Sequence, residues 1–229
     1  NEAAHAARLR MSGLYEVAVK RGLITAEAAT EEQSTIRYQS GYGDIEEAGL
    51  VIEAVFEDMQ VKCDVLKALD KAAPRAILAS NTSYLDIDVM AGCLSDPSRL
   101  VGLHFFSPAH IMKLLEIVKG VQTSDYALAT GYALAKHLRK IPVEVGVCDG
   151  FVGNRMLQRV REAAELLLLD GAEPEQIDRA MRGFGYPMGL YETQDMSGLD
   201  IAWANRRRQQ ATRDPERRYS KVQDQVCEA

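Results

Sequence analysis

The sequence has few cysteines and no long apolar run. Its four cysteines, Cys63, Cys93, Cys148 and Cys227, lie far apart among 229 residues and form no C-x-x-C pair. This spacing argues against a zinc knuckle and against a disulfide-dense secreted domain, so we expect a reducing compartment, the cytoplasm, with a peroxisomal or mitochondrial address as the alternative. No stretch approaches the roughly 20 apolar residues that a membrane-spanning helix needs, and we expect no membrane span.

An excess of positive charge is also missing. The chain has 27 basic and 33 acidic side chains, a net charge of −6, which gives no long-range attraction to a phosphate backbone. We therefore expect no nucleic-acid partner. His5, His110 and His137 have no second ligand nearby in the sequence, and we expect no metal site. Hydrophobic residues at 47% and charged residues at 26% are typical of a folded globular chain.

Short apolar runs and helical patterns alternate along the first two thirds of the chain. The segments 2–20 and 25–34 predict a helical hairpin with Thr25 as an N-cap, and later segments predict helices over 59–72 and 124–139. Five apolar runs have the length of buried strands: 50–55, 76–79, 100–105, 114–118 and 141–147. The alternation predicts an α/β fold, a mostly parallel sheet covered by helices, up to residue 148.

The pattern becomes helical from residue 150. The segment 151–170 predicts a long helix that ends before Gly171, and Pro174 opens a second helix over 175–182. We thus expect two domains, an α/β domain over 1–148 and a small all-α domain over 149–229. An arginine-rich segment, 206–218, favours a solvated connector and leaves a ligand-binding patch as the alternative.

A glycine-rich dinucleotide loop is absent. The loop around Gly41 and Gly43 precedes a predicted strand, and the glycines of 183–189 have the wrong spacing for a pyrophosphate cradle. If a nucleotide binds this fold, we expect the first strand, turn and helix to lie upstream of Asn1 or to come from elsewhere.

Two residues twelve positions apart form the first candidate for acid–base chemistry. His104 closes a predicted strand, and Glu116 interrupts an apolar one. A carboxylate that reaches the imidazole would fix its tautomer and raise its pKa, as a general base requires. The alternative, an internal histidine and a glutamate on an edge face, is favoured on spacing alone. Ser83 ends another predicted strand and is either a site hydroxyl or a helix N-cap. Asn154 lies in the first turns of the long helix, either facing the sheet edge or as an ordinary polar position.

Several blocks resemble the L-3-hydroxyacyl-CoA dehydrogenases, above all the dehydrogenase part of multifunctional β-oxidation enzymes. Order and spacing agree for the blocks VIEAVFE (51–57), VK (61–62), SNTS (80–83), GLHFFSP (102–108), MKLLE (112–116), GFVGNR (150–155), GFGYPMG (183–189) and DMSGLD (195–200). The resemblance implies NAD-dependent oxidation of L-3-hydroxyacyl-CoA in fatty-acid β-oxidation. It also implies an incomplete Rossmann-like sheet, without its first βαβ unit, followed by the helical domain.

The resemblance also assigns roles to residues. His104 would be the base, Glu116 its partner, Ser83 a hydrogen-bonding group for the substrate oxygen, and Asn154 a contact to the acyl-CoA. The cofactor contacts would be Val55, Phe56, Glu57, Lys62, Ser83 and Ser107, the last at a position where many relatives have asparagine.

The absence of the glycine-rich dinucleotide loop bears on whether this chain can act alone. We expect it to be truncated at both ends and inactive alone, with acyl-CoA as substrate, and to form a homo-oligomer or part of a larger multifunctional chain. The alternative is a non-catalytic fragment that binds acyl-CoA or a partner subunit.

Overall fold

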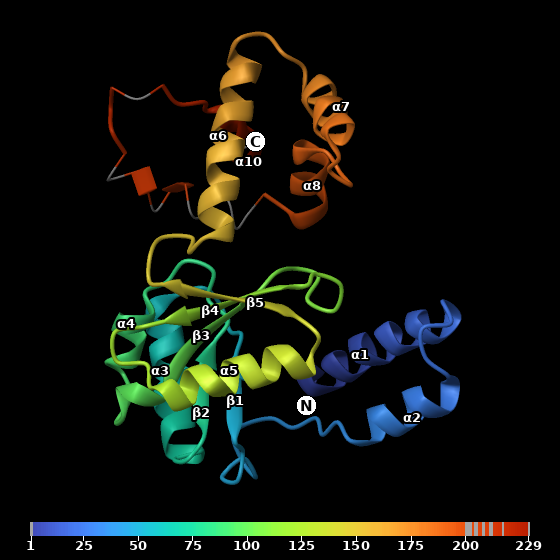
Figure 1. Ribbon diagram of the computed structural model, residues 1–229, viewed down its shortest axis with the longest axis vertical. Coiled ribbons are helices and arrows are strands. Elements are labelled where there is room, and N and C mark those ends of the chain that lie inside the picture. Colours follow the sequence, from blue (N-terminus) through green and yellow to red (C-terminus); the bar gives the residue numbers. More distant parts are fainter. Residues whose placement is uncertain are drawn as a thin grey trace.

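The computed structural model describes residues 2–199, 203, 206–207, 209–210, 213–216 and 218–228. A five-stranded sheet with helices on both faces occupies the lower half of Figure 1, and a helical part that starts at residue 153 stands above it. The predicted fold class, a mostly parallel sheet followed by an all-α part, is confirmed.

The strands lie in the sheet in the order of the chain. Their bounds are β1 Leu50–Glu53, β2 Ile77–Ser80, β3 Leu100–Phe105, β4 Leu114–Lys119 and β5 Ile141–Gly146. All neighbouring strands are parallel except β3 and β4, which are antiparallel. The connection between β3 and β4 contains no helix to carry the chain back across the sheet, so the strand direction reverses there.

Two apolar layers cover the two faces of the sheet. The helices α3 (Met59–Ala72) and α4 (Ile87–Ala91) pack on one face, where Leu78 belongs to their cluster. The helix α5 (Asp125–His137) packs on the other face against the side chains that alternate with it, such as Ile77 and Ala79. A 3₁₀ turn, η1 (Pro97–Arg99), leads into β3. Because β1, β2 and β3 run parallel, their carboxyl ends lie along one edge of the sheet.

The predicted N-terminal hairpin is confirmed. Its helices are α1 (Glu2–Lys20) and α2 (Ala26–Ser34), and the Thr25 hydroxyl caps α2 by accepting from the Ala28 N–H at 3.2 Å. α1 has no buried residue, and the hairpin extends sideways from the sheet (Figure 1).

Among the described residues, the helical part contains α6 (Gly153–Leu169), α7 (Pro174–Phe184), α8 (Leu190–Ser197) and α10 (Val222–Glu228). Gly171 follows α6 with a φ of 98°, as its predicted position requires. Between β5 and α6 the chain turns through two consecutive residues in the left-handed region, Gly150 at φ 71° and Phe151 at φ 47°. This turn sets the direction in which α6 leaves the sheet.

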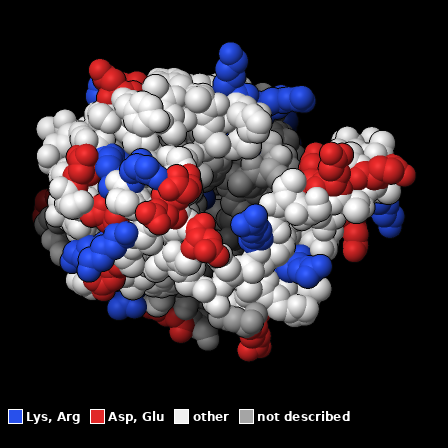
Figure 2. Space-filling view, turned by 90° about the horizontal axis from the view of Figure 1, so that it is seen from below, with Lys and Arg blue, Asp and Glu red and all other residues white. Residues whose placement is uncertain are grey.

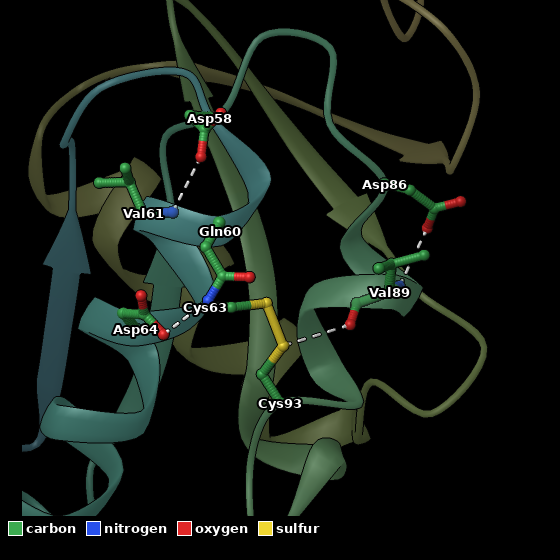
Figure 3. The surroundings of a disulfide bond; sticks show 8 residues. All are labelled: Asp58, Gln60, Val61, Cys63, Asp64, Asp86, Val89 and Cys93. Carbon is green, nitrogen blue, oxygen red and sulfur yellow. Dashed lines mark hydrogen bonds between the residues drawn. A yellow bond between two sulfur atoms is a disulfide. The ribbon is translucent and has the colours of Figure 1, made fainter.

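A disulfide joins Cys63 of α3 to Cys93, which follows α4 (Figure 3). Thirty residues separate the two cysteines in the sequence, so their spacing gives no sign of the bond. Cys148 and Cys227 are free thiols. One bond in 229 residues is far from the disulfide density of a small secreted domain, the class that the cysteine spacing argues against.

On the face at the sheet end of the molecule, acidic and basic side chains lie intermingled (Figure 2). Within the described part of the chain, no helix has the length and apolar character needed to cross a membrane.

Candidate active site

His104 and Glu116 face each other across the antiparallel pair of strands. They are register partners on β3 and β4, and the His104 Nδ1 lies 2.7 Å from the Glu116 Oε2. β4 is flanked by β3 and β5, so Glu116 lies inside the sheet and not on an edge face. The spacing of twelve residues thus corresponds to a hydrogen-bonded pair.

The second oxygen of Glu116 holds the start of α6. Its Oε1 accepts hydrogen bonds from the backbone N–H groups of Val152, at 3.0 Å, and Gly153, at 2.8 Å. Burial by itself raises the pKa of Glu116, but the hydrogen bonds from His104, Gly153 and Val152 outweigh it and hold the pKa below its ordinary value. The carboxylate is therefore ionised and connects the imidazole to the helical part.

Two aromatic rings enclose His104. The centroid of its ring lies 4.5 Å from that of Phe106 and 5.7 Å from that of Phe151, and the residue is 3% exposed. Gly153 makes the close approach of α6 possible, because a Cβ there would lie 2.6 Å from the Phe106 Cζ. The imidazole is thus held in a nearly dry environment.

Ser83 lies in a loop that is held by hydrogen bonds to the Glu57 carboxylate. The Glu57 Oε1 accepts hydrogen bonds from the Thr82 hydroxyl and from the backbone N–H groups of Ser83 and Tyr84, at 2.7, 2.8 and 3.0 Å. Ser83 does not cap the following helix, because the N-cap of α4 is Asp86. The Ser83 loop is therefore positioned by a carboxylate from the loop after β1.

Lys62 is fully buried beneath this loop. Its ammonium contacts both Glu53 oxygens at 3.0 Å, the Val55 carbonyl at 3.1 Å and the Glu57 Oε2 at 3.5 Å. Glu53 also accepts from the Ser80 hydroxyl. One cation thus contacts two carboxylates at the carboxyl end of β1.

The other predicted residues lie around the same edge of the sheet. Val55 and Phe56 follow β1 and are exposed, Phe56 to 80%. Ser107 is exposed in the loop after β3 and precedes a cis-proline, Pro108. Asn154 is half-buried in the first turn of α6, next to the Gly153 that Glu116 holds.

Glu53, Ser80, Thr82 and Asn81 take part in the site and are absent from the sequence-based assignment. The Asn81 Oδ1 accepts from the Phe105 N–H at 2.9 Å and so ties the exit of β2 to that of β3. Glu53 occupies an apolar strand just as Glu116 does, and that is the signal by which it could be found. Among the described residues, no three histidine, cysteine or acidic side chains gather as a metal site.

Two family models match this chain over nearly its whole length. The NAD binding domain of 3-hydroxyacyl-CoA dehydrogenase matches residues 1–148, and the C-terminal domain of the same enzyme matches residues 150–229. The chain belongs to the 3-hydroxyacyl-CoA dehydrogenase family. The predicted resemblance is thereby confirmed, and NAD is the cofactor that the first of these domains binds.

Curated relatives and solved structures agree with this family. The peroxisomal bifunctional enzyme of Danio rerio is 40% identical over 96% of this chain and 32% of its own length. The fatty acid oxidation complex subunit alpha of Acinetobacter baylyi is 40% identical over 82% of this chain and 26% of its own. The (S)-3-hydroxybutyryl-CoA dehydrogenase of Ralstonia eutropha superposes with a TM-score of 0.91 at 31% identity, covering 100% of this chain and 82% of that chain. The chain spans about a third or less of the curated relatives' length.

Proposed function

We propose that this chain carries the acid–base and substrate-binding residues of an NAD-dependent oxidation of L-3-hydroxyacyl-CoA to 3-ketoacyl-CoA. The observation that carries the proposal is the buried pair of His104 and Glu116, with 2.7 Å between Nδ1 and Oε2. Names of relatives in fatty-acid oxidation support the substrate class.

The ionised carboxylate determines which nitrogen of His104 accepts a proton. Because Glu116 accepts at Nδ1, the ring carries its proton there and keeps the lone pair on Nε2. Nε2 takes the proton of the substrate hydroxyl, and the Glu116 carboxylate stabilises the imidazolium that forms. NAD, when bound, supplies the acceptor for the hydride that leaves C3.

The exposed residues after β1 fit the nicotinamide end of the cofactor. Val55 and Phe56 present apolar surface at the carboxyl edge of the sheet, where open α/β sheets bind ligands. Ser83 and Ser107 supply hydroxyl groups at the same edge. Lys62 and Glu57 support this region from beneath, since the Lys62 ammonium is buried against carboxylates.

The substrate is assigned to the region between the two parts of the chain. Ser83 would donate a hydrogen bond to the substrate oxygen, and Asn154 would hold the acyl-CoA from the side of α6. This assignment divides the chain into an NAD-binding domain over 1–148 and a helical domain over 149–229.

We assign acyl-CoA as the small-molecule partner, and a homo-oligomer or a larger multifunctional chain as the assembly. The names of the relatives from Danio rerio and Homo sapiens place those proteins in the peroxisome. For this chain the sequence-based assignment is the cytoplasm, with the peroxisome or the mitochondrion as the alternative.

The test is the oxidation of NADH by acetoacetyl-CoA, followed by the loss of nicotinamide absorbance. We expect negligible turnover from the 229 residues, whose sequence lacks the glycine-rich loop, and turnover after an upstream extension that carries this loop. In the extended protein, His104→Gln should lower the rate on the order of 10²–10⁴-fold. The matched control is His137→Gln, an exposed position on α5. An unchanged rate in His104→Gln overturns the assignment of the base.

The burial of His104 favours a second candidate, a fragment that binds acyl-CoA without turnover. The ring is enclosed by Phe106 and Phe151, which restricts access to it. Calorimetric binding of acetoacetyl-CoA to an extended protein that takes up NADH but shows no turnover would support this candidate over the enzyme.

A further inference from the structure

A cavity of about 410 Å³ lies on the side of α6 that faces the segment after α8. Its walls come from α6, from that segment and from Tyr84, the residue after Ser83. Its most frequent lining residue is arginine, and we call it the arginine cavity after Arg159, Arg161, Arg206, Arg213 and Arg218. Arg208 and Arg217 of the predicted arginine-rich segment lie outside the described residues.

The face of α6 that lines this cavity is polar. Gln158, Arg161 and Glu165 follow one another at helical spacing and belong to its wall, whereas Met156 and Leu167 of the same helix are exposed to 67% and 51%. The apolar stripe of α6, with Leu157, Ala164 and Leu168, packs against α7 and α8. A mostly polar face of the same helix, with Leu166 as its apolar member, is left to line the cavity.

Two guanidinium nitrogens of the cavity are buried without a hydrogen-bond partner, the Arg161 Nε and the Arg206 Nη2. The Arg206 guanidinium is already held in place, because its Nε donates to Asp224 at 2.7 Å and its Nη1 to Gln223 at 2.8 Å. Folded proteins rarely leave buried donors unpaired, so these two N–H groups call for acceptors that the described residues do not supply.

The other arginines of the cavity have partners of their own, and Arg206 forms an ion pair with Asp224 in addition to its unpaired Nη2. Arg159 pairs with Glu162 at 2.8 Å, Arg218 pairs with Asp170 at 2.6 Å, and the Arg213 guanidinium lies over the Tyr219 ring. Burial raises the pKa of Glu165 to about 7, so this carboxyl is only partly ionised at neutral pH. Four acidic side chains, Asp149, Glu162, Glu165 and Asp214, also line the wall, so the case for a ligand depends on the two unpaired N–H groups.

We propose that the arginine cavity binds a phosphate-bearing small molecule whose oxygens accept from the Arg161 Nε and the Arg206 Nη2. Phosphate oxygens match the planar, multiple donors of guanidinium groups and carry enough charge for two of them. The volume is that of a site for an organic ligand and exceeds the space that one phosphate fills. This inference takes up the alternative stated for the arginine-rich segment 206–218, a ligand-binding patch. It does not depend on the proposed dehydrogenase activity.

The probe is pyrophosphate, titrated into the 229-residue chain in a calorimeter at constant ionic strength. Arg161→Met removes one unpaired donor and should weaken binding roughly tenfold or more. The matched control is Arg179→Met, an exposed arginine of α7 outside the cavity wall, and this variant should bind within about twofold of wild type. Arg161→Lys keeps the charge without the planar donor and should fall between them, which separates recognition from misfolding.

Coenzyme A, which carries phosphate groups of its own, is titrated in parallel to identify the source of the phosphate. If coenzyme A competes with pyrophosphate and Arg161→Met weakens its binding, the ligand of the cavity is the phosphate-bearing part of the acyl-CoA substrate. Binding of coenzyme A that Arg161→Met leaves unchanged would identify a separate phosphorylated ligand. The proposal fails if pyrophosphate produces no binding heat with wild type, or if it binds equally well to folded Arg161→Met. Neither result bears on the NADH assay.

Discussion

Glu116 is the residue on which the proposed chemistry depends most directly, because one carboxylate serves both His104 and α6. Glu116→Gln preserves the size of the side chain but removes its charge. We expect its amide to favour the imidazole tautomer with the proton on Nε2, which cannot accept from the substrate. In the extended protein, turnover of acetoacetyl-CoA should fall on the order of 10²–10⁴-fold.

The control for this variant is Glu144→Gln, an exposed carboxylate on the neighbouring strand β5. It should retain wild-type turnover. A Glu116→Gln protein that turns over acetoacetyl-CoA at the wild-type rate would show that the carboxylate does not set the state of His104.

Single residues differ in how far the sequence predicts them. His104 and Glu116 are predictable because a strand end and an interrupted apolar strand both leave marks in the pattern. The complete burial of Lys62 is not, since its partners Glu53 and Val55 come from a different element and its cage exists only when α3 packs on β1. The spacing of residues in the sequence predicts contacts within one helix or strand, but not contacts between two of them.

At the scale of elements, the start of α6 approaches the Phe106 ring closely because Gly153 has no side chain. A Cβ at Gly153 would collide with the Phe106 ring at 2.6 Å, whereas a Cβ at Gly183 of α7 meets nothing within 4 Å. Alanine favours a helix over glycine by up to about 1 kcal/mol. We therefore expect Gly183→Ala to raise the free energy of unfolding in urea and Gly153→Ala to lower it. Equal stabilisation of both variants would contradict the close fit.

The disulfide between Cys63 of α3 and Cys93 ties α3 to the segment that follows α4 on one face of the sheet. It closes a loop with a sequence separation of 30 residues, so its removal should increase the entropy of the unfolded chain. Cys93→Ser should lower the free energy of unfolding by about 2–4 kcal/mol under oxidising conditions. Cys148→Ser, at a free thiol, is the control. Identical melting of the Cys93→Ser protein and wild type without reductant would show that the bond contributes nothing.

Most elements are predictable to within a few residues, and α3 coincides with its predicted range. The direction of β4 is harder to predict, because apolar strands look alike whether parallel or antiparallel. The missing helix between residues 105 and 114 is the only mark of the reversal.

For the whole molecule, Glu165 should make stability depend on pH. Its pKa is about 7 in the folded state against an ordinary value of 4.5. Between these pH values the folded chain keeps the proton and the unfolded chain has lost it, so stability falls as pH rises through this window and levels off above it. In wild type the melting temperature should fall by roughly a few degrees between pH 5 and pH 8. Glu165→Gln should remove most of this fall. The same slope in both proteins would contradict the raised pKa.

The identity of the family is predictable from the sequence because its blocks are local, each a strand end or a helix start. The arginine cavity is not predictable in the same way. Its walls come from α6, from the segment after α8 and from Tyr84, and only the packing of these segments decides which guanidinium nitrogens remain unpaired.

The shared carboxylate of Glu116 has a consequence for engineering. Since the two amides at the beginning of α6 bind the oxygen next to the one that binds the imidazole, any tilt of that helix is transmitted to the proton acceptor. A chimaera that takes its helical half from a relative must keep this joint, or it will retain every residue of the site and still misalign it.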